Sequence, residues 1–178
     1  MEEIEIENKK LETALSGIKK IYMNISNGRL KRSAEHVYYE HLMFLFAIKK
    51  LAQPSQIPQP NQIYINAFLE CFVVHLRNLF DFYYTPASKR KNQDDMLAED
   101  YIRDINLFKG GRTPKHKLSY ISKRANKQFA HLTYHRNRYN SRTKPWQFGK
   151  IHSMLYPTIK SFYLALPGNR KNGFILMN

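Results

Sequence analysis

The segment from Gln62 to Tyr84 constrains the fold most, because its apolar residues surround a helix on nearly every side. A helix of this kind is stable in a globular protein where neighbouring elements cover it. Apolar residues also recur at intervals of three, four and seven in residues 4–25, 33–51 and 145–166. The sequence shows no strand alternation sustained over a hairpin pair. These patterns predict an all-α fold, an up-and-down bundle of five or six helices.

Capping and turn residues divide the chain into elements. The expected helices span residues 4–27, 33–53, 62–84, 94–108, 114–136 and 145–166. Thr113-Pro114 marks the clearest start, since threonine caps helices and proline fits the first helical position. Pro157 is expected to kink the last helix, and residues 167–178 are expected to form a frayed tail. The chain of 178 residues suits one domain, residues 1–178.

Charge is distributed very unevenly along the chain. All 14 acidic residues lie at or before Asp104, where 14 Lys and Arg balance them. Residues 105–178 carry 15 Lys and Arg, so the net charge of +15 belongs to this part. A basic surface favours a polyanionic partner, because neutralising phosphates releases counterions. We therefore expect a nucleic acid as partner, with the acidic residues 94–104 either forming a solvated face or acting as an internal counterweight.

Composition also bears on location and cofactors. The start of the chain is acidic where a secretory signal would be basic, and no stretch approaches the ~18 uncharged apolar residues of a membrane span. The single cysteine, Cys71, lies in an apolar run and is expected to be a core residue. We expect a cytoplasmic chain with no membrane contact and no cofactor. His131 and His135 are four apart, as zinc ligands can be, but the surrounding cations oppose a dication, so no metal is predicted.

Polar residues interrupt the apolar segment 62–84 at His75, Arg77, Asn78 and Asp81. Burying such groups is costly unless they are paired. Arg77 and Asp81 are four apart and can pair on one face, while His75 and Asn78 are three apart on another. Two interpretations remain open: a structural salt bridge with an asparagine that fixes helix register, or a functional cleft.

A second polar set lies on the expected basic helix. Arg124 and His131 are seven apart, which places them two turns along one face. An imidazole can move the proton of a 2′-hydroxyl near neutral pH, and a guanidinium can stabilise charge on a phosphate. The pair therefore suits cleavage of RNA without a metal, although Arg and His at this spacing also occur by chance in basic helices.

An all-helical chain of this size with Arg124-x6-His131, and with Arg77-Asn78 on an earlier central helix, resembles the HEPN superfamily, whose signature is Arg-x4-6-His. Many members are metal-independent ribonucleases of toxin-antitoxin or phage-defence systems that pair as homodimers; others bind nucleotides or are inactive scaffolds. The resemblance implies that Arg124 stabilises phosphate and His131 acts as acid/base, with Arg77, Asn78, Asp81 and Asn126 in support. The residue after the family's arginine is usually polar, but here it is Ala125. The chain also resembles uncharacterised bacterial proteins.

Cations and aromatic rings alternate after the basic helix. Bases stack on aromatic side chains while cations follow the backbone of a single strand, so this composition predicts a nucleic-acid-binding surface. The residues assigned to it are Lys127, Arg136, Arg138, Tyr139, Arg142 and Lys144. Trp146, at a helix start, is expected to pack in the core instead.

Two functions follow from these observations. The first is RNA binding with metal-independent endoribonuclease activity at Arg124 and His131. The alternative is a non-enzymatic helical module that binds nucleic acid or an acidic protein partner, in which the polar residues form a buried structural network. Ala125 favours the alternative.

Overall fold

The structure, a computed structural model, describes residues 25–53, 62–125, 127, 134 and 146–177. Within these residues the chain is all-α and contains no strand. The four longest helices are α2 (Asn27–Ala52), α3 (Gln62–Tyr84), α6 (Lys115–Ala125) and α7 (Phe148–Ala165). Shorter elements are η2 (Ala87–Lys89), α4 (Ala98–Tyr101), α5 (Ile105–Gly111), α8 (Gly168–Lys171) and η5 (Asn172–Met177). The predicted all-α fold is confirmed.

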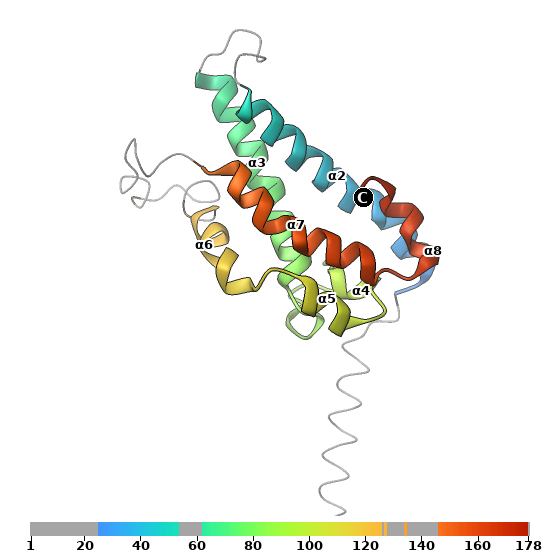
Figure 1. The fold of residues 1–178 in the computed structure, drawn as a ribbon. Helices are drawn as coiled ribbons and strands as arrows, with labels where there is room; N and C mark the ends of the chain where they lie inside the picture. The colour runs from blue at the N-terminus through green and yellow to red at the C-terminus, as the bar shows by residue number, and fades with distance from the viewer. Residues whose placement is uncertain (1–24, 54–61, 126, 128–133, 135–145, 178) are drawn as a thin grey trace, which may run out of the picture.

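The long helices alternate in direction around α3 (Figure 1). Phe72 packs on Phe148 and Phe82 on Phe162, so α3 and α7 run in the same direction. Helix α6 runs opposite to α3, because Lys115 at its start lies over the ring of Phe80 near the end of α3. Helix α2 folds back along α3 in the most extensive pairing of the molecule. The order α2, α3, α6, α7 is therefore up-and-down, as predicted.

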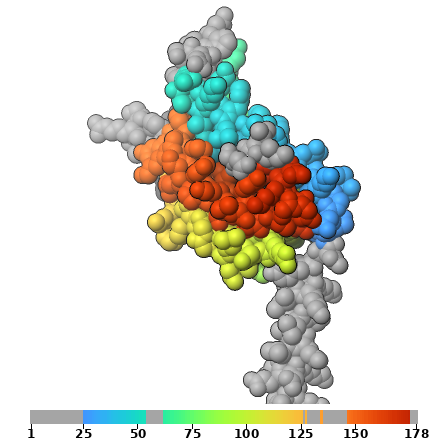
Figure 2. All heavy atoms as spheres, turned by 45° about the vertical axis from the view of Figure 1, so that its right-hand side comes forward, coloured from blue at the N-terminus to red at the C-terminus, as the bar shows by residue number. Residues whose placement is uncertain are grey.

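Aromatic rings fill the centre of the bundle. Phe82, Tyr83 and Phe108 surround Phe162, and all four side chains are buried. Edge-to-face contacts among such rings add stability beyond the area that they bury. The C-terminal elements close this core from outside: Figure 2 shows α7 and α8 as one face beside α2, and Phe174 of η5 is fully buried against Phe162.

The start of α2 differs from the prediction. The sequence suggested that one helix ends near Asn27-Gly28 and another begins at Ser33, but α2 begins at Asn27. The Ser26 hydroxyl accepts a hydrogen bond from the Arg29 amide and caps the helix, so Ser26, not Ser33, is the N-cap. The expected helix over residues 4–27 lies almost wholly outside the described residues.

The acidic segment also differs from the predicted structure. Instead of one helix over residues 94–108, the chain forms α4 and α5, separated by Ile102–Asp104. The Asp104 carboxylate accepts hydrogen bonds from the amides of Asn106 and Leu107, and so Asp104 caps the start of α5. Gly110 and Gly111 are the last two residues of α5, which therefore ends three residues beyond the predicted end at Phe108.

Helices α6 and α7 differ from the predicted helices in smaller ways. Thr113 does not cap α6, because its hydroxyl donates to the carbonyl of Met154 on α7. Helix α6 begins at Lys115, one residue after Pro114, and its described part ends at Ala125. Pro157 lies within α7, which continues to Ala165.

The expected frayed tail is wrong for residues 168–174. These residues form α8 and the start of η5, and the Arg170 guanidinium donates hydrogen bonds to the carbonyls of Asp100 and Tyr101 and to the amide oxygen of Asn27. The buried ring of Phe174 anchors the same segment. A periodicity search misses such an anchor, because it consists of one aromatic residue and one arginine.

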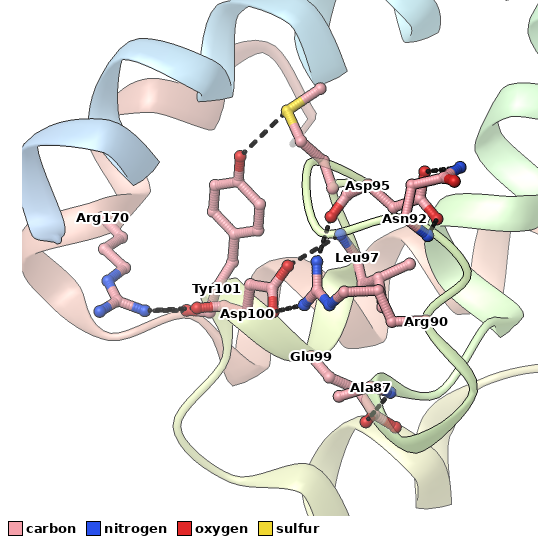
Figure 3. A network of polar contacts seen from close by, with 10 residues as sticks. Ala87, Arg90, Asn92, Asp95, Leu97, Glu99, Asp100, Tyr101 and Arg170 are labelled. Carbon is pink, nitrogen blue, oxygen red and sulfur yellow. Dashed lines mark hydrogen bonds and ion pairs between the residues drawn. The ribbon is translucent and has the colours of Figure 1, made fainter. Parts of the chain in front are cut away.

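Two carboxylates of residues 94–104, those of Glu99 and Asp100, have partners inside the fold (Figure 3). Asp100 pairs with Arg90, and both side chains are only 9% exposed. Glu99 accepts a hydrogen bond from the amide of Ala87 and pairs with Lys109 at 3.5 Å. Glu99 therefore acts as an internal counterweight to the basic part of the chain through Lys109, whereas Asp100 pairs with Arg90 inside the neutral part.

One described helix, α3, is long and apolar enough to cross a membrane by length and composition alone, with a mean hydropathy of 1.2. In this fold α3 packs against α2, α6 and α7, and Phe72, Leu76 and Leu79 are buried in the core.

Candidate functional site

Helix α6 has an apolar side and a basic side. Leu118, Ile121 and Ala125 are buried against the bundle. The opposite side carries cations at intervals of three and four residues, with a tyrosine among them. We call this set, together with Lys127 just after the helix, the α6 surface: Lys117, Tyr120, Lys123, Arg124 and Lys127. Neither α6 nor α7 contains an acidic residue.

The α6 surface is open to solvent except at Arg124. Lys117, Lys123 and Lys127 are exposed, and Tyr120 is 49% exposed. Tyr134 lies farther along the chain and is 94% exposed. A ring that is half or more exposed among cations can stack on a base while the cations contact phosphates.

Arg124 lies at the end of α6 and is partly buried. Its guanidinium carbon is 4.2 Å from the centre of the Trp146 ring, a cation–π contact. Trp146 is 4% exposed and packs on Phe72 of α3, so its predicted place in the core is confirmed. Stacking on a fixed ring restricts the guanidinium to a narrow range of positions.

Several predicted site residues lie outside the described residues. They are His131, Asn126, Arg136, Arg138, Tyr139, Arg142 and Lys144. Their assignments stay predictions, and so does the predicted approach of Arg124 and His131.

The polar residues of α3 meet partners from α2. The Nδ1 of His75 donates to the carboxylate of Glu40 at 2.7 Å, and the Nδ2 of Asn78 donates to the same oxygen at 3.0 Å. His75 is buried, with 9% of its surface exposed. The prediction that His75 and Asn78 share a face is therefore confirmed, and the partner that sequence reasoning missed is Glu40, 35 residues earlier than His75.

Arg77 and Asp81 form an open pair. Their side chains are 45% and 61% exposed, and the Nε of Arg77 is 4.0 Å from the carboxylate of Asp81. A contact this long between exposed groups contributes little to stability. Nearby atoms of the fold still displace water from the carboxyl group, and this desolvation raises the pKa of Asp81 despite the cations of Arg77, Lys91 and Lys115. The geometry thus fits the cleft interpretation for this pair.

A pocket of about 450 Å³ contains three of the predicted supporting residues, Arg77, Asn78 and Asp81. It lies between α2, α3 and the loop that follows α3. Among the described residues, no residue of α6 lines it, so the structure separates these three from Arg124.

Comparisons with protein-family models, with curated proteins and with solved structures find no match for this chain.

Proposed function

We propose that the protein binds single-stranded RNA along the α6 surface. One observation carries the proposal: three cations and an exposed tyrosine share one side of α6, the exposed Lys127 follows the helix, and residues 105–177 contain no acidic side chain. Cations spaced along a helix neutralise successive phosphates, and Tyr120 offers a face to a base.

The tyrosine favours RNA over an acidic protein as partner. An acidic protein surface would pair with the cations but would leave the ring of Tyr120 without a stacking partner. This ring is 49% exposed between Lys117 and Lys123, and an unpaired base could stack on it. Base stacking is worth about 1–3 kcal/mol per base by alanine substitution, which corresponds to roughly a 5-fold to 150-fold change in affinity.

The experiment is a fluorescence-anisotropy titration of a labelled single-stranded RNA. Tyr120→Ala should weaken binding at least ~5-fold, because it removes stacking and leaves the charge unchanged. Tyr156→Ala is the matched control, since Tyr156 on α7 is also 49% exposed. Equal affinities for wild type and Tyr120→Ala would contradict the proposal, and tight binding of an acidic peptide instead of RNA would favour the protein partner.

Metal-independent cleavage of the bound RNA is a second candidate function. The Arg124-x6-His131 spacing and the anchored position of Arg124 over Trp146 favour it. A guanidinium held in place stabilises developing charge without reorganisation during the reaction. His131 would then take the proton of the 2′-hydroxyl as its oxygen bonds to phosphorus, and the P–O5′ bond would break with a proton going to the leaving 5′-oxygen, so the products would be a 2′,3′-cyclic phosphate and a 5′-hydroxyl.

Cleavage should persist in EDTA and should spare DNA, which lacks the 2′-hydroxyl. His131→Ala should reduce the rate at least ~100-fold while RNA binding persists. Wild-type protein that binds RNA but does not cleave it in any of several sequences would support the non-enzymatic module. The contact of Arg124 with a core tryptophan fits that module as well, because it gives the arginine a packing role.

A further inference from the structure

The pocket between α2 and α3 has an apolar wall and a polar rim. Val37, Leu79, Phe82 and Leu97 contribute the wall. The polar lining includes Arg77, Asn78, Asp81 and Lys91, together with the carboxylates of Glu40 and Asp95. Its volume of about 450 Å³ lies within the usual range of small-molecule sites.

Two polar side chains of the pocket, those of Arg77 and Asp81, do not satisfy each other's hydrogen-bonding groups. Within the described part of the chain, the side chains of Arg77 and Asp81 share one contact of 4.0 Å and make no shorter hydrogen bond. The carboxylate therefore keeps two oxygens for a ligand, and the guanidinium keeps its donors. By contrast, the Asn78 amide donates a hydrogen bond to the Glu40 carboxylate, which also accepts one from His75.

A carboxylate beside a guanidinium matches one heterocycle in particular. The pairing edge of guanine presents two neighbouring donors, N1–H and the 2-amino group, followed by the O6 acceptor. Asp81 can accept from both donors while Arg77, one helical turn earlier, donates to O6. Adenine presents an acceptor where guanine has N1–H, so it would leave the carboxylate without that bond.

We propose that this pocket binds a guanine nucleotide, with the base edge at Asp81 and Arg77 and the phosphate near Lys91. The ligand is either a free nucleotide or a guanine within an RNA strand, because both present the same base. The site does not rest on RNA binding by α6, since no described residue of α6 lines it.

Isothermal titration of the full chain with guanosine monophosphate tests the site. The expected affinity is at least ~10-fold higher than for adenosine monophosphate, and inosine monophosphate, which lacks the 2-amino group, should lie between them. Asp81→Asn should weaken guanosine monophosphate binding at least ~10-fold, because the amide accepts at only one atom. Lys91→Ala should weaken binding of the nucleotide but not of guanosine.

Asp94→Asn is the matched control, because Asp94 is an exposed carboxylate outside the pocket. Circular dichroism should show that both variants fold. A tetranucleotide containing guanine distinguishes the two sources: binding of the strand alone assigns the pocket to RNA, and binding of the monophosphate assigns it to free nucleotide. The inference is overturned if neither ligand binds, if guanine and adenine ligands bind equally, or if Asp81→Asn changes nothing. Variants of α6 should leave this binding intact, so failure of the RNA proposal is a separate result.

Discussion

At the scale of single residues, buried polar groups determine how the bundle responds to pH. His41 of α2 is 5% exposed, and its Nε2 is 2.7 Å from the hydroxyl of Tyr83. Burial lowers the pKa of His41 from 6.5 to about 3, because the imidazolium would lose its hydration there. The folded protein therefore holds this imidazole neutral.

The low pKa of His41 predicts acid destabilisation. Between pH 6.5 and about 3 the unfolded chain binds one proton more than the folded chain at this site, so stability is complete above pH 6.5 and falls as pH drops through the window. One proton corresponds to a slope of ~1.4 kcal/mol per pH unit. Urea unfolding between pH 7 and pH 4 should show this slope in wild type.

His41→Gln keeps a hydrogen-bonding group near Tyr83 but removes the titration. The variant should be less stable at pH 7, and its stability should fall less steeply with acid. Equal slopes for His41→Gln and wild type would contradict this account. His36→Gln is the control, since His36 lies on the same helix and is exposed.

At the scale of elements, close helix packing depends on particular small residues. Helices α5 and α7 cross where the Ser161 hydroxyl lies within hydrogen-bond distance of the carbonyls of Leu107 and Phe108. A Cβ added at Gly111 would be 2.6 Å from the Ser161 Oγ, and so Gly111 permits the approach. The neighbouring Gly110 has no heavy atom within 4 Å of an added Cβ.

Adjacent glycines should therefore respond in opposite directions. Gly111→Ala forces α5 away from α7 and should destabilise the protein by about 1–3 kcal/mol. Gly110→Ala should stabilise it by about 0.4–1 kcal/mol, because alanine restricts the unfolded chain and favours the helix. Thermal unfolding of both variants checks the prediction, which fails if Gly110→Ala is the more destabilised.

The sequence predicted helices correctly where the apolar periodicity extends over many turns. The prediction failed where the contacts of a single side chain set the boundary of an element. The run 62–84 predicted α3 with the bounds observed, because its apolar pattern persists over six turns. The start of α5 depends on the Asp104 carboxylate, which caps amides two and three residues later, and the ordered segment after Pro167 depends on Arg170, whose partners are distant in sequence. The contacts of Arg170 are long-range, so no local pattern reports them, whereas the cap at Asp104 is local and the choice of Asp94 or Asp95 as the helix start overlooked it.

The candidate site was predictable to a similar degree. Sequence reasoning identified Arg77, Asn78 and Asp81, which line one pocket, but it could not find Glu40, because a salt-bridge partner on another helix has no signature of its own. Tyr120 was also missed. Its signal was the position of a tyrosine on the basic side of α6, opposite the buried residues Leu118 and Ile121.

At the scale of the whole molecule, the uneven charge is the feature to explain. The carboxylates of Glu99 and Asp100 pair with Lys109 and Arg90 within the fold, so they are not available to pair with the cations of the α6 surface. The lysines of the α6 surface remain exposed. Association with RNA should accordingly be fast and should weaken as salt rises.

The salt dependence of RNA affinity tests the central claim most directly. If about five phosphates are contacted, log affinity for single-stranded RNA should fall against log salt with a slope near −3.5. Replacing Lys117, Lys123 and Lys127 by alanine should reduce the steepness by about 2, since each lost phosphate contact removes ~0.7. The control triple variant, with alanine at Lys31, Lys49 and Lys89, lowers the net charge equally at exposed positions outside α6 and should keep the wild-type slope. Equal slopes for the two triple variants, or RNA binding that salt leaves unchanged, would contradict the account.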